Sequence, residues 1–263
     1  MKDFKNRQID LHMHTDGSDG TWTVEELKEE LIKNNISIFS ITDHDEIDNI
    51  AKMEKILKPE DDMIFIKGVE ATASFQDREY HLPVYNYDST NEPFIKFLNW
   101  SRDLRLDFNR RFVKYMETIN PNVSYRDFVN YKEDPGKGGW KSANYMLDRK
   151  IHRNMAEHFE DVKNSGLSIT FKSPEEVISL GKKSGGYVFL AHPSYHYREE
   201  GMPLEELKMW VELGIDGIEC FTPYNNHNQA DYYVDFCKKN NLMISGGSDC
   251  HGEFIPGRFL GVP

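Results

Sequence analysis

Two histidines stand two residues apart in the segment DLHMHTDGSDGT, at His12 and His14. In an extended strand, residues two apart point to the same side, so two neutral imidazoles can meet one metal ion there. A His-x-His pair alone is a weak signal, because such pairs also occur on strands by chance. Here Asp16 and Asp19 follow at once in a glycine-rich loop, which disfavours ordinary core packing.

Three further segments place ionisable residues where an apolar strand is expected to end. FSITDHDEID carries Asp43, His44 and Asp45, GVEATASF carries Glu70, and FLAHPSYH carries His192. Charges at a buried strand end are costly unless they find partners or a metal ion. We therefore predict His44 as a metal ligand and expect one of the two aspartates to cap the next helix. Glu70 would suit a carboxylate that bridges two divalent ions, although a surface glutamate explains this position alone equally well.

The remaining candidates lie in two short motifs. His81 starts a predicted strand in REYHLPVYNYD and, as a lone histidine, depends on the other motifs for its assignment. GSDCHGEF holds Asp249 and His251 two residues apart after two glycines, which let backbone approach closely. Cys250 between them would point the other way as a packing residue, with an outer role at the metal as the less favoured alternative. We interpret His196 as a surface residue.

These candidates share a position relative to the predicted strands. Six predicted β segments carry a His, Asp or Glu at or beside an end, and five of those ligands lie at the C-terminal end. Active sites of parallel α/β folds form at that edge. Histidine and carboxylate ligands without thiolates suit Mn²⁺, Zn²⁺ or Fe²⁺.

Short β-rich runs alternate with helical ones along most of the chain, which favours an α/β fold with right-handed crossovers. Runs such as ISIFSIT and GYVFLA are almost continuously apolar, as in strands that are buried on both faces of a parallel sheet. The predicted strands are Gln8–His12, Ile36–Thr42, Met63–Val69, His81–Tyr87, Gly186–Leu190, Gly214–Cys220 and Leu242–Gly246. The predicted helices are Thr23–Asn34, Ser173–Ser184, Pro203–Leu213 and Asn226–Asn240; Thr23 and Glu26 have capping-box spacing, and Pro174 suits the first position of its helix.

Residues 91–169 break this rhythm. They begin with a long polar helix, Glu92–Thr118, and continue into the glycine-rich segment DPGKGGWKSANY. We predict a helical insertion over one end of the sheet, with residues 1–90 and 170–263 forming the main domain. The insertion would act either as a stabilising cap or as a substrate lid.

Composition narrows the functional classes. The 263-residue chain has a formal net charge of −12, which opposes binding to long duplex nucleic acid. No run approaches the roughly 20 apolar residues of a membrane span, so no membrane partner is expected. Met1–Asp10 is polar, so we expect no signal peptide. The three cysteines are scattered and lack CxxC spacing, which favours a reduced, cytoplasmic location.

The motifs HMHTDGSDG, ITDHD, GVE, YH, AHP and GSDCHG occur in the order of the PHP (polymerase and histidinol phosphatase) family, which the sequence resembles over nearly its whole length. The resemblance implies a distorted (β/α)7 TIM-like barrel with a helical insertion. It also implies two or three divalent ions, Mn, Zn or Fe, and hydrolysis of phosphoesters by metal-activated hydroxide. Family members with His at the position of Asp19 make the third ion the least firmly implied.

Carried onto this sequence, the resemblance implies ligands for each ion and candidates for proton transfer. Asp19 or His251 would protonate the leaving oxygen. The implied ligand sets are His12, His14, Glu70 and Asp249 for one ion, Glu70, His81 and His192 for a second, and Asp19, His44 and His251 for a third.

The chain resembles the stand-alone branch of the family, which implies a small phosphorylated substrate. A nucleoside 3',5'-bisphosphate is the first expectation, and 5'→3' exonuclease action on short oligonucleotides or histidinol-phosphate hydrolysis are alternatives. A non-catalytic metal-binding regulatory module is disfavoured, because every motif position is filled.

Candidate substrate contacts lie mostly in the insertion. Arg110 and Lys137 are the candidate phosphate contacts, since guanidinium groups suit phosphate oxygens. Arg102 and Arg105 are expected to lie on a solvated helix face. Trp140 and Tyr224 would be able to stack on a base, although most aromatics in such a chain belong to the core.

Overall fold

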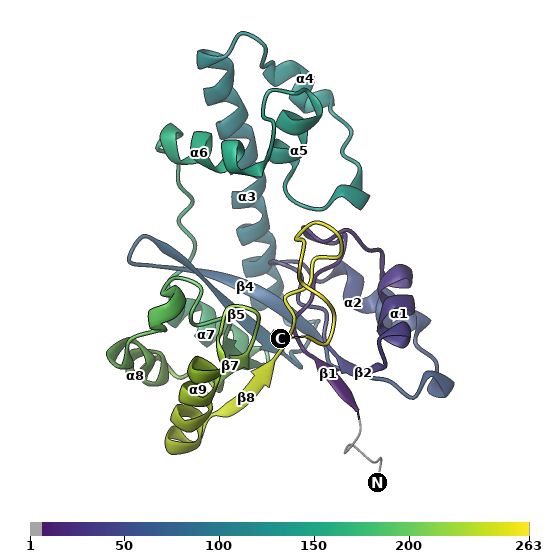
Figure 1. Cartoon of the computed structure of the whole chain (residues 1–263), viewed down its shortest axis with the longest axis vertical. Coiled ribbons are helices and arrows are strands. Elements are labelled where there is room, and N and C mark those ends of the chain that lie inside the picture. The colour runs from purple at the N-terminus through teal and green to yellow at the C-terminus, as the bar shows by residue number, and fades with distance from the viewer. Residues whose placement is uncertain (1–6, 263) are drawn as a thin grey trace.

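The computed structural model describes residues 7–262, so most of the Met1–Asp10 segment, for which no signal peptide was expected, lies outside the described residues. The fold is mixed α/β, with two sheets in the lower part and a helical part above them (Figure 1). The described residues form eight strands: β1 (Gln8–Asp10), β2 (Ile36–Phe39), β3 (Ile64–Phe65), β4 (Gly68–Phe75), β5 (Arg78–Tyr85), β6 (Tyr187–Leu190), β7 (Gly217–Phe221) and β8 (Met243–Gly246).

Nine α-helices accompany the strands in residues 7–262. They are α1 (Val24–Lys33), α2 (Asp48–Ile56), α3 (Glu92–Ile119), α4 (Tyr125–Asn130), α5 (Lys141–Asp148), α6 (Met155–Ser165), α7 (Pro174–Lys183), α8 (Leu204–Leu213) and α9 (His227–Asn240). The predicted helix starts are confirmed at α1 and α7. Thr23 and Glu26 form a capping box, and Ser173 caps α7 with Pro174 at its first position.

The strand pairing differs from the all-parallel expectation. β1, β2 and β3 pair in parallel, as do β6, β7 and β8, but β4 pairs antiparallel with β5 and β5 antiparallel with β6. The predicted strand Met63–Val69 is two strands, and the second continues into a hairpin. Gln76 and Asp77 turn that hairpin with φ angles of 49° and 59°, a feature of type I′ turns. The turn carries no glycine, so the usual sequence signal for a hairpin is missing.

The two sheets meet at both of their edges. Beyond β1 and β8, Met13 bridges Cys250 in parallel; beyond β2, His44 bridges Glu70 at the start of β4. These contacts are isolated bridges, and the regular strands of residues 7–262 do not form the continuous sheet of a closed barrel. Two apolar cores fill the lower part. One packs β4–β7 against α7–α9, and the other packs β2 against α1 and α2.

Helices α3 to α6 form the upper part, and the long helix α3 connects it to the sheets below (Figure 1). This part has its own apolar core, in which Phe112 and Met116 of α3 pack against Phe128, Tyr145 and Met146 of α4 and α5. No described helix has the length and apolar character that crossing a membrane would require.

His158 on α6 gives the upper part a dependence of stability on pH. The side chain is buried edge-on against Phe112, and burial together with the neighbouring His152 lowers the pKa of His158 from 6.5 to about 4. Between pH 4 and pH 6.5, His158 therefore binds a proton more readily in the unfolded chain than in the folded one. The stability contributed by the neutral ring is present above pH 6.5 and is lost as the pH falls toward 4.

We expect this loss to be about 2 kcal/mol between pH 7 and pH 5 in the wild type and absent in His158→Leu. Urea unfolding of both proteins at the two pH values measures it. Equal loss in both proteins would show that His158 does not carry this dependence.

Candidate metal centre

Two ligand pairs predicted from opposite ends of the chain lie side by side. The Asp249 amide donates to the His12 carbonyl at 2.8 Å, and the His14 amide donates to the Cys250 carbonyl at 2.8 Å. Met13 and Cys250, the middle residues of the two triplets, are both buried in the same apolar core. Because side chains alternate along extended backbone, the flanking histidines and Asp249 turn to the opposite side. The prediction that Cys250 is a packing residue is confirmed.

Glu70 lies at the centre of the cluster and is buried. Its Oε1 is 3.1 Å from His12 Nε2, 3.2 Å from His81 Nδ1 and 3.3 Å from His192 Nε2. Its Oε2 is 3.4 Å from His14 Nε2 and 3.1 Å from His44 Nδ1. One carboxylate thus faces five imidazoles that come from four separate segments.

Glu70 and His81 reach the centre from strand positions that differ from the predicted strand ends. Glu70 is the third residue of β4, and His81 lies inside β5. The antiparallel register pairs Thr72 with His81 and Glu70 with Pro83, so Glu70 and His81 stand on the same face of the hairpin. The hairpin, rather than a parallel strand end, brings these two ligands together.

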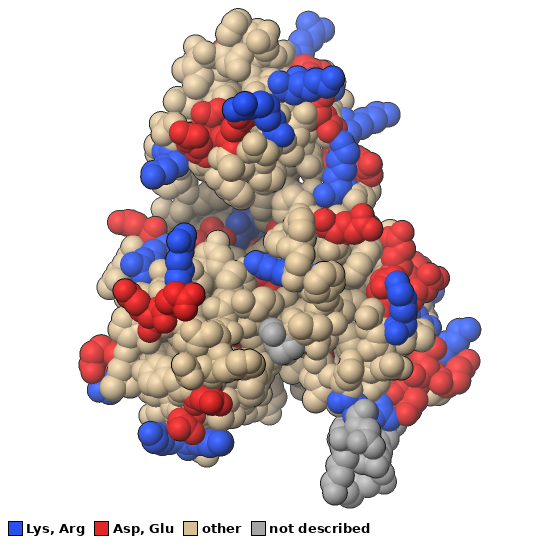
Figure 2. Space-filling model, viewed as in Figure 1, with Lys and Arg blue, Asp and Glu red and all other residues tan. Residues whose placement is uncertain are grey.

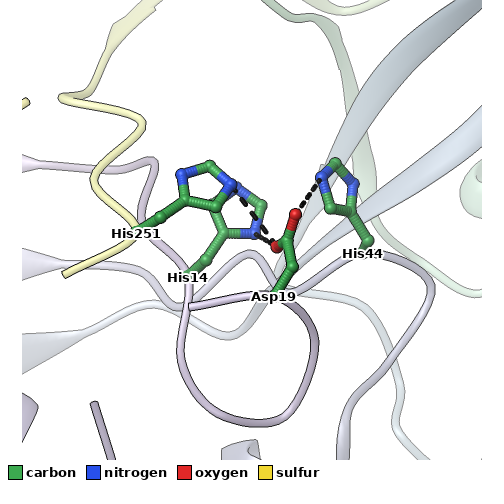
Figure 3. A group of neighbouring side chains, drawn as sticks. All are labelled: His14, Asp19, His44 and His251. Atoms are coloured by element: carbon green, nitrogen blue, oxygen red, sulfur yellow. Dashed lines mark ion pairs between the residues drawn. The ribbon is translucent and has the colours of Figure 1, made fainter. Parts of the chain in front are cut away.

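Asp19 marks a second part of the cluster, where it lies among His14, His44 and His251 (Figure 3). Asp19 Oδ1 is 3.4 Å from His251 Nε2 and 3.6 Å from His14 Nδ1, and Asp19 Oδ2 is 3.8 Å from His44 Nε2. Asp249 Oδ1 lies 3.1 Å from His14 Nε2 and so connects the two parts.

All nine predicted ligands fall into four overlapping groups whose ligand atoms lie within 4.8 Å of one another. The assignment of each residue to a particular ion stays a prediction, since His14 belongs to the group around Asp19 as well as to the group around Glu70. The groups are His14, Asp19, His44 and His251; His12, His14 and Glu70; His12, His192 and Asp249; and His44, Glu70 and His81.

The donor set fits divalent cations. His12 Nε2, His44 Nδ1 and Glu70 Oε2 are buried and make no hydrogen bond, although each lies close to other ligand atoms. Buried polar atoms without partners are costly, and a cation would satisfy all three at once. Imidazole and carboxylate donors without thiolate match Mn²⁺, Zn²⁺ and Fe²⁺.

The electrostatics of the centre also favour bound cations. Burial lowers the pKa of His44 well below its usual value, while Glu70 and Glu219 overcome the effect of burial and raise the pKa of His12 well above it. Burial likewise opposes the charged form of His251, but Asp19 and Asp249 raise its pKa to about 9. The carboxylates therefore hold positive charge at this site, and metal ions would compete with protons for the same donors.

Two of the predicted ligands are held in strained backbone. His192 has φ 28° and Asp249 has φ 47°, a region that residues other than glycine rarely adopt. Such conformations cost on the order of 1–3 kcal/mol each and persist where the surrounding structure fixes them.

Glu219 supports the cluster from behind and was missed in the sequence analysis. His12 Nδ1 donates to Glu219 Oε1 at 2.9 Å, and the His192 amide donates to Glu219 Oε2 at 2.8 Å. The carboxylate thus fixes the tautomer of His12 and the backbone of His192. The sequence held a signal for this residue, because Glu219 follows Gly217 and Ile218 in an apolar segment, much as Glu70 follows Gly68 and Val69.

Arg258 is a second residue that the sequence did not indicate. Its Nη1 donates to Asp249 Oδ2 at 2.5 Å, and its guanidinium stacks on Tyr224 at 4.5 Å. The Tyr224 hydroxyl donates to the same Asp249 oxygen at 3.0 Å. Tyr224, considered above for stacking on a base, instead helps to hold a predicted ligand.

The expectation that Arg105 lies on a solvated face is wrong. Arg105 is buried, donates to Thr72 Oγ1 at 2.7 Å and to Glu79, and lies 3.5 Å from Asp45 Oδ2. Glu79 Oε1 in turn lies 3.1 Å from His81 Nε2. Arg105 of α3 thus connects the upper part, through Glu79, to the predicted ligand His81.

Neither aspartate beside His44 caps a helix. Asp43 accepts from the Thr15 amide and the Ser18 hydroxyl and so shapes the loop that carries Asp19; burial raises its pKa to about 7. Asp45 accepts from the Thr72 amide and hydroxyl. Helix α2 begins farther on, and Glu46 Oε1 accepts from the amides of residues 47 and 48 there.

The predicted substrate contacts lie apart from the cluster. Arg110 is exposed on α3, and Lys137 forms an ion pair with Asp148 at 2.5 Å. Trp140 lies closer, with its ring 6.1 Å from that of His44. His196, expected at the surface, is half-buried and donates to the Glu79 carbonyl at 2.7 Å.

A glycine turn of the upper part touches the Asp19 loop directly. The Gly139 amide donates to the Asp19 carbonyl at 2.8 Å. Gly138 has φ 64°, and a Cβ there would lie 2.7 Å from the same carbonyl oxygen and 2.7 Å from Phe254. Only glycine allows this approach.

We expect Gly138→Ala to displace Asp19 and to lower the rate of phosphoester hydrolysis by about a hundredfold. Gly166→Ala is the matched control, since Gly166 has φ 65° with no atom within 4 Å of the added Cβ. Steady-state rates and melting temperatures of both variants separate displacement from general strain. Equal rate losses in the two variants would contradict the role of this contact.

Comparison with known proteins relates the first half of the chain to a family. The model of the PHP domain matches residues 10–134. A 5'-3' exoribonuclease of Haemophilus influenzae is 25% identical over 93% of this chain and 90% of its own length. A 3',5'-nucleoside bisphosphate phosphatase of Chromobacterium violaceum is 21% identical over 96% of this chain and 90% of its own length.

The structural comparison agrees with the match to the family model. A solved structure from Bifidobacterium adolescentis, described as a metal-dependent phosphoesterase, superposes with a TM-score of 0.81 at 25% identity, covering 97% of this chain and 92% of that one. The PHP model begins at Asp10, immediately before the His-x-His pair, and extends past the hairpin that carries Glu70 and His81. Residues 10–134, which carry six of the nine predicted ligands, therefore match the PHP domain family.

Proposed function

We propose that this protein is a metal-dependent phosphoesterase that hydrolyses a small phosphorylated nucleotide, with a nucleoside 3',5'-bisphosphate as the first candidate substrate. The observation that carries the proposal is the convergence of five imidazoles on the buried Glu70 carboxylate, with unpartnered donor atoms among them. Bound Mn²⁺, Zn²⁺ or Fe²⁺ ions would bind phosphate oxygens and lower the pKa of bound water.

The chain's own residues supply binding and proton transfer in this proposal. Asp19 and His251 are the candidates for protonating the leaving oxygen. The two lie 3.4 Å apart, so they would act as a pair. Arg110 and Lys137 stay candidates for distant phosphate groups of a longer substrate.

A cleft beside the cluster supports a substrate of limited size. It encloses 230 Å³ and is lined by His44, the loop 16–18, Arg102, Arg105 and residues 138–141. We interpret residues 91–169 as an insertion that covers the site, with residues 1–90 and 170–263 as the PHP barrel domain. The two bridges between the sheets support a distorted barrel, and the three buried free cysteines support a reduced, cytoplasmic location.

A second candidate function is 5'→3' exonuclease action on short oligonucleotides. The named activity of the relative from Haemophilus influenzae favours it, since that relative aligns over nearly the whole chain. Both activities would use the same metal centre and differ in the length of chain that the cleft admits.

A substrate series tests the proposal. Purified Mn²⁺-loaded protein is given adenosine 3',5'-bisphosphate, a 5'-phosphorylated trinucleotide and histidinol phosphate, and phosphate and mononucleotides are measured. Phosphate release from the bisphosphate supports the first candidate, and mononucleotides from the trinucleotide support the second. Hydrolysis of none of the three would contradict the proposed substrate class.

A further inference from the structure

A larger cavity lies on the far side of Arg105 and Trp140 from the cleft beside the metal centre. It encloses 520 Å³ between the β4–β5 hairpin and helices α3 and α6, within the usual range for a small-molecule site. Arg105, Asn109 and Trp140 line both spaces, so the cavity is adjacent to the cleft that His44 lines. Figure 2 shows the molecule hollowed between the upper helical part and the sheets below.

Four aromatic side chains line the cavity. Phe75 comes from the hairpin, Phe108 from α3, Trp140 from the turn before α5 and Phe159 from α6. Phe159 is 63% exposed and borders the cavity, so its ring is accessible to a ligand. Flat rings from four separate segments that border one space suit a flat aromatic ligand.

The charges in the cavity disfavour a phosphate group as its occupant. Arg105 is engaged by Glu79 and Asp45, and Arg78 donates to the Tyr197 hydroxyl at 2.8 Å. Glu79 adds a carboxylate that pairs with Arg105 and lies 3.1 Å from His81 Nε2. A polyanion would meet the Arg105 guanidinium, whose charge is already compensated by two carboxylates, together with the carboxylate of Glu79.

Neutral polar residues border the cavity instead. His158 lines the cavity and its Nδ1 makes no hydrogen bond. Ser142 and Asn109 lie on the same wall. Neutral imidazole, hydroxyl and amide groups offer the donors and acceptors that the edge of a heterocyclic base requires.

The cavity is also coupled to the predicted ligands. Glu79 on its wall lies 3.1 Å from His81 Nε2, and the Trp140 ring stands 6.1 Å from that of His44. A ligand ring seated against Trp140 would therefore lie next to a phosphate held at the centre. We propose that this cavity binds the nucleobase of the substrate whose phosphate reaches the metal centre, an inference that rests on the proposed function and assigns a place to the base of that substrate.

Adenosine is the probe that tests this site, because it carries the base and ribose but no phosphoester. Equilibrium binding of adenosine and, separately, of inorganic phosphate is measured by ligand-observed NMR on protein loaded with Zn²⁺, which is diamagnetic. We expect saturable adenosine binding that ribose does not compete. Phe159→Ala and Trp140→Leu should each weaken adenosine binding by about tenfold, the effect of losing one stacking partner. Phe159→Ala should leave phosphate binding unchanged.

Trp100→Leu is the matched control, because Trp100 also contacts a cation, Lys172, but borders neither the cavity nor the cleft. It should bind adenosine as the wild type does. Absence of saturable adenosine binding, or unchanged binding in both cavity variants, would overturn the inference. Adenosine binding without hydrolysis of any phosphoester would instead reject the proposed function and leave the base site standing.

Discussion

Replacing Glu70 with glutamine should remove most of the bound metal and lower phosphoester hydrolysis by about a thousandfold or more. The carboxylate is buried, and its two oxygens face five imidazole nitrogens at 3.1 to 3.4 Å. An amide keeps the shape but loses the charge, and its NH₂ group cannot coordinate a cation. Metal content after dialysis and the rate of phosphate release measure the two effects.

Glu25→Gln is the matched control, because Glu25 is exposed on α1 and lies away from the cluster. It should bind metal and hydrolyse substrate as the wild type does. The metal-free Glu70→Gln protein should also keep the fold, since glutamine fills the same volume. A Glu70→Gln variant with full metal content and a normal rate would contradict the assignment of Glu70 to the centre.

Glu219→Gln should weaken metal binding by about 10- to 100-fold while leaving every predicted ligand in place. Glu219 accepts two hydrogen bonds, from His12 Nδ1 and from the His192 amide, with different oxygens. Glutamine has one oxygen, so its NH₂ group must face one of these two donors. Either His12 loses the partner that fixes its tautomer or His192 loses support for its strained backbone.

Competition with a fluorescent chelator for Zn²⁺ measures this change in affinity. Glu212→Gln, an exposed residue of α8, serves as the control. At saturating metal the Glu219→Gln protein should regain a large part of its activity, which distinguishes a positioning residue from a ligand. Unchanged affinity would show that His12 and His192 are held by other contacts.

The metal centre itself was largely predictable from the sequence, because its signals are local. His12 and His14, and likewise Asp249 and His251, alternate with apolar residues, and that alternation fixes which side of an extended chain they face. The two glycines before Asp249 let its segment lie close to His12, where a Cβ on Gly247 would lie 2.3 Å from His12 Cβ. Local pattern and tertiary contact agree at these positions.

The parts that escaped prediction depend on pairings between distant segments. The β4–β5 hairpin lacks a glycine turn, so its antiparallel register was not visible and His81 was placed at a strand start. Arg105 is one of several arginines on α3, and only the packing of that helix on the hairpin selects it for burial against Glu79. Arg258 follows the last motif in a segment without regular structure, so no periodicity linked it to Asp249.

In the insertion, the long helix was predictable from the sequence, but the residues that reach the site were not. Its helices follow from composition, and α3 runs from Glu92 to Ile119 against a predicted Glu92–Thr118. The packing of α3 against the sheets determines which residues of the insertion reach the site. Trp140 and the Gly138–Gly139 turn come close to His44 and Asp19, whereas Arg110 and Lys137 face elsewhere.

The most direct test of the account is a metal titration of activity. Protein stripped with a chelator and then dialysed is titrated with Mn²⁺, and phosphate release from adenosine 3',5'-bisphosphate is followed together with the number of ions bound. The account predicts no turnover without metal and full turnover once two or three ions occupy the centre formed around Glu70. Turnover that persists in the stripped protein, or that does not follow metal occupancy, would contradict it.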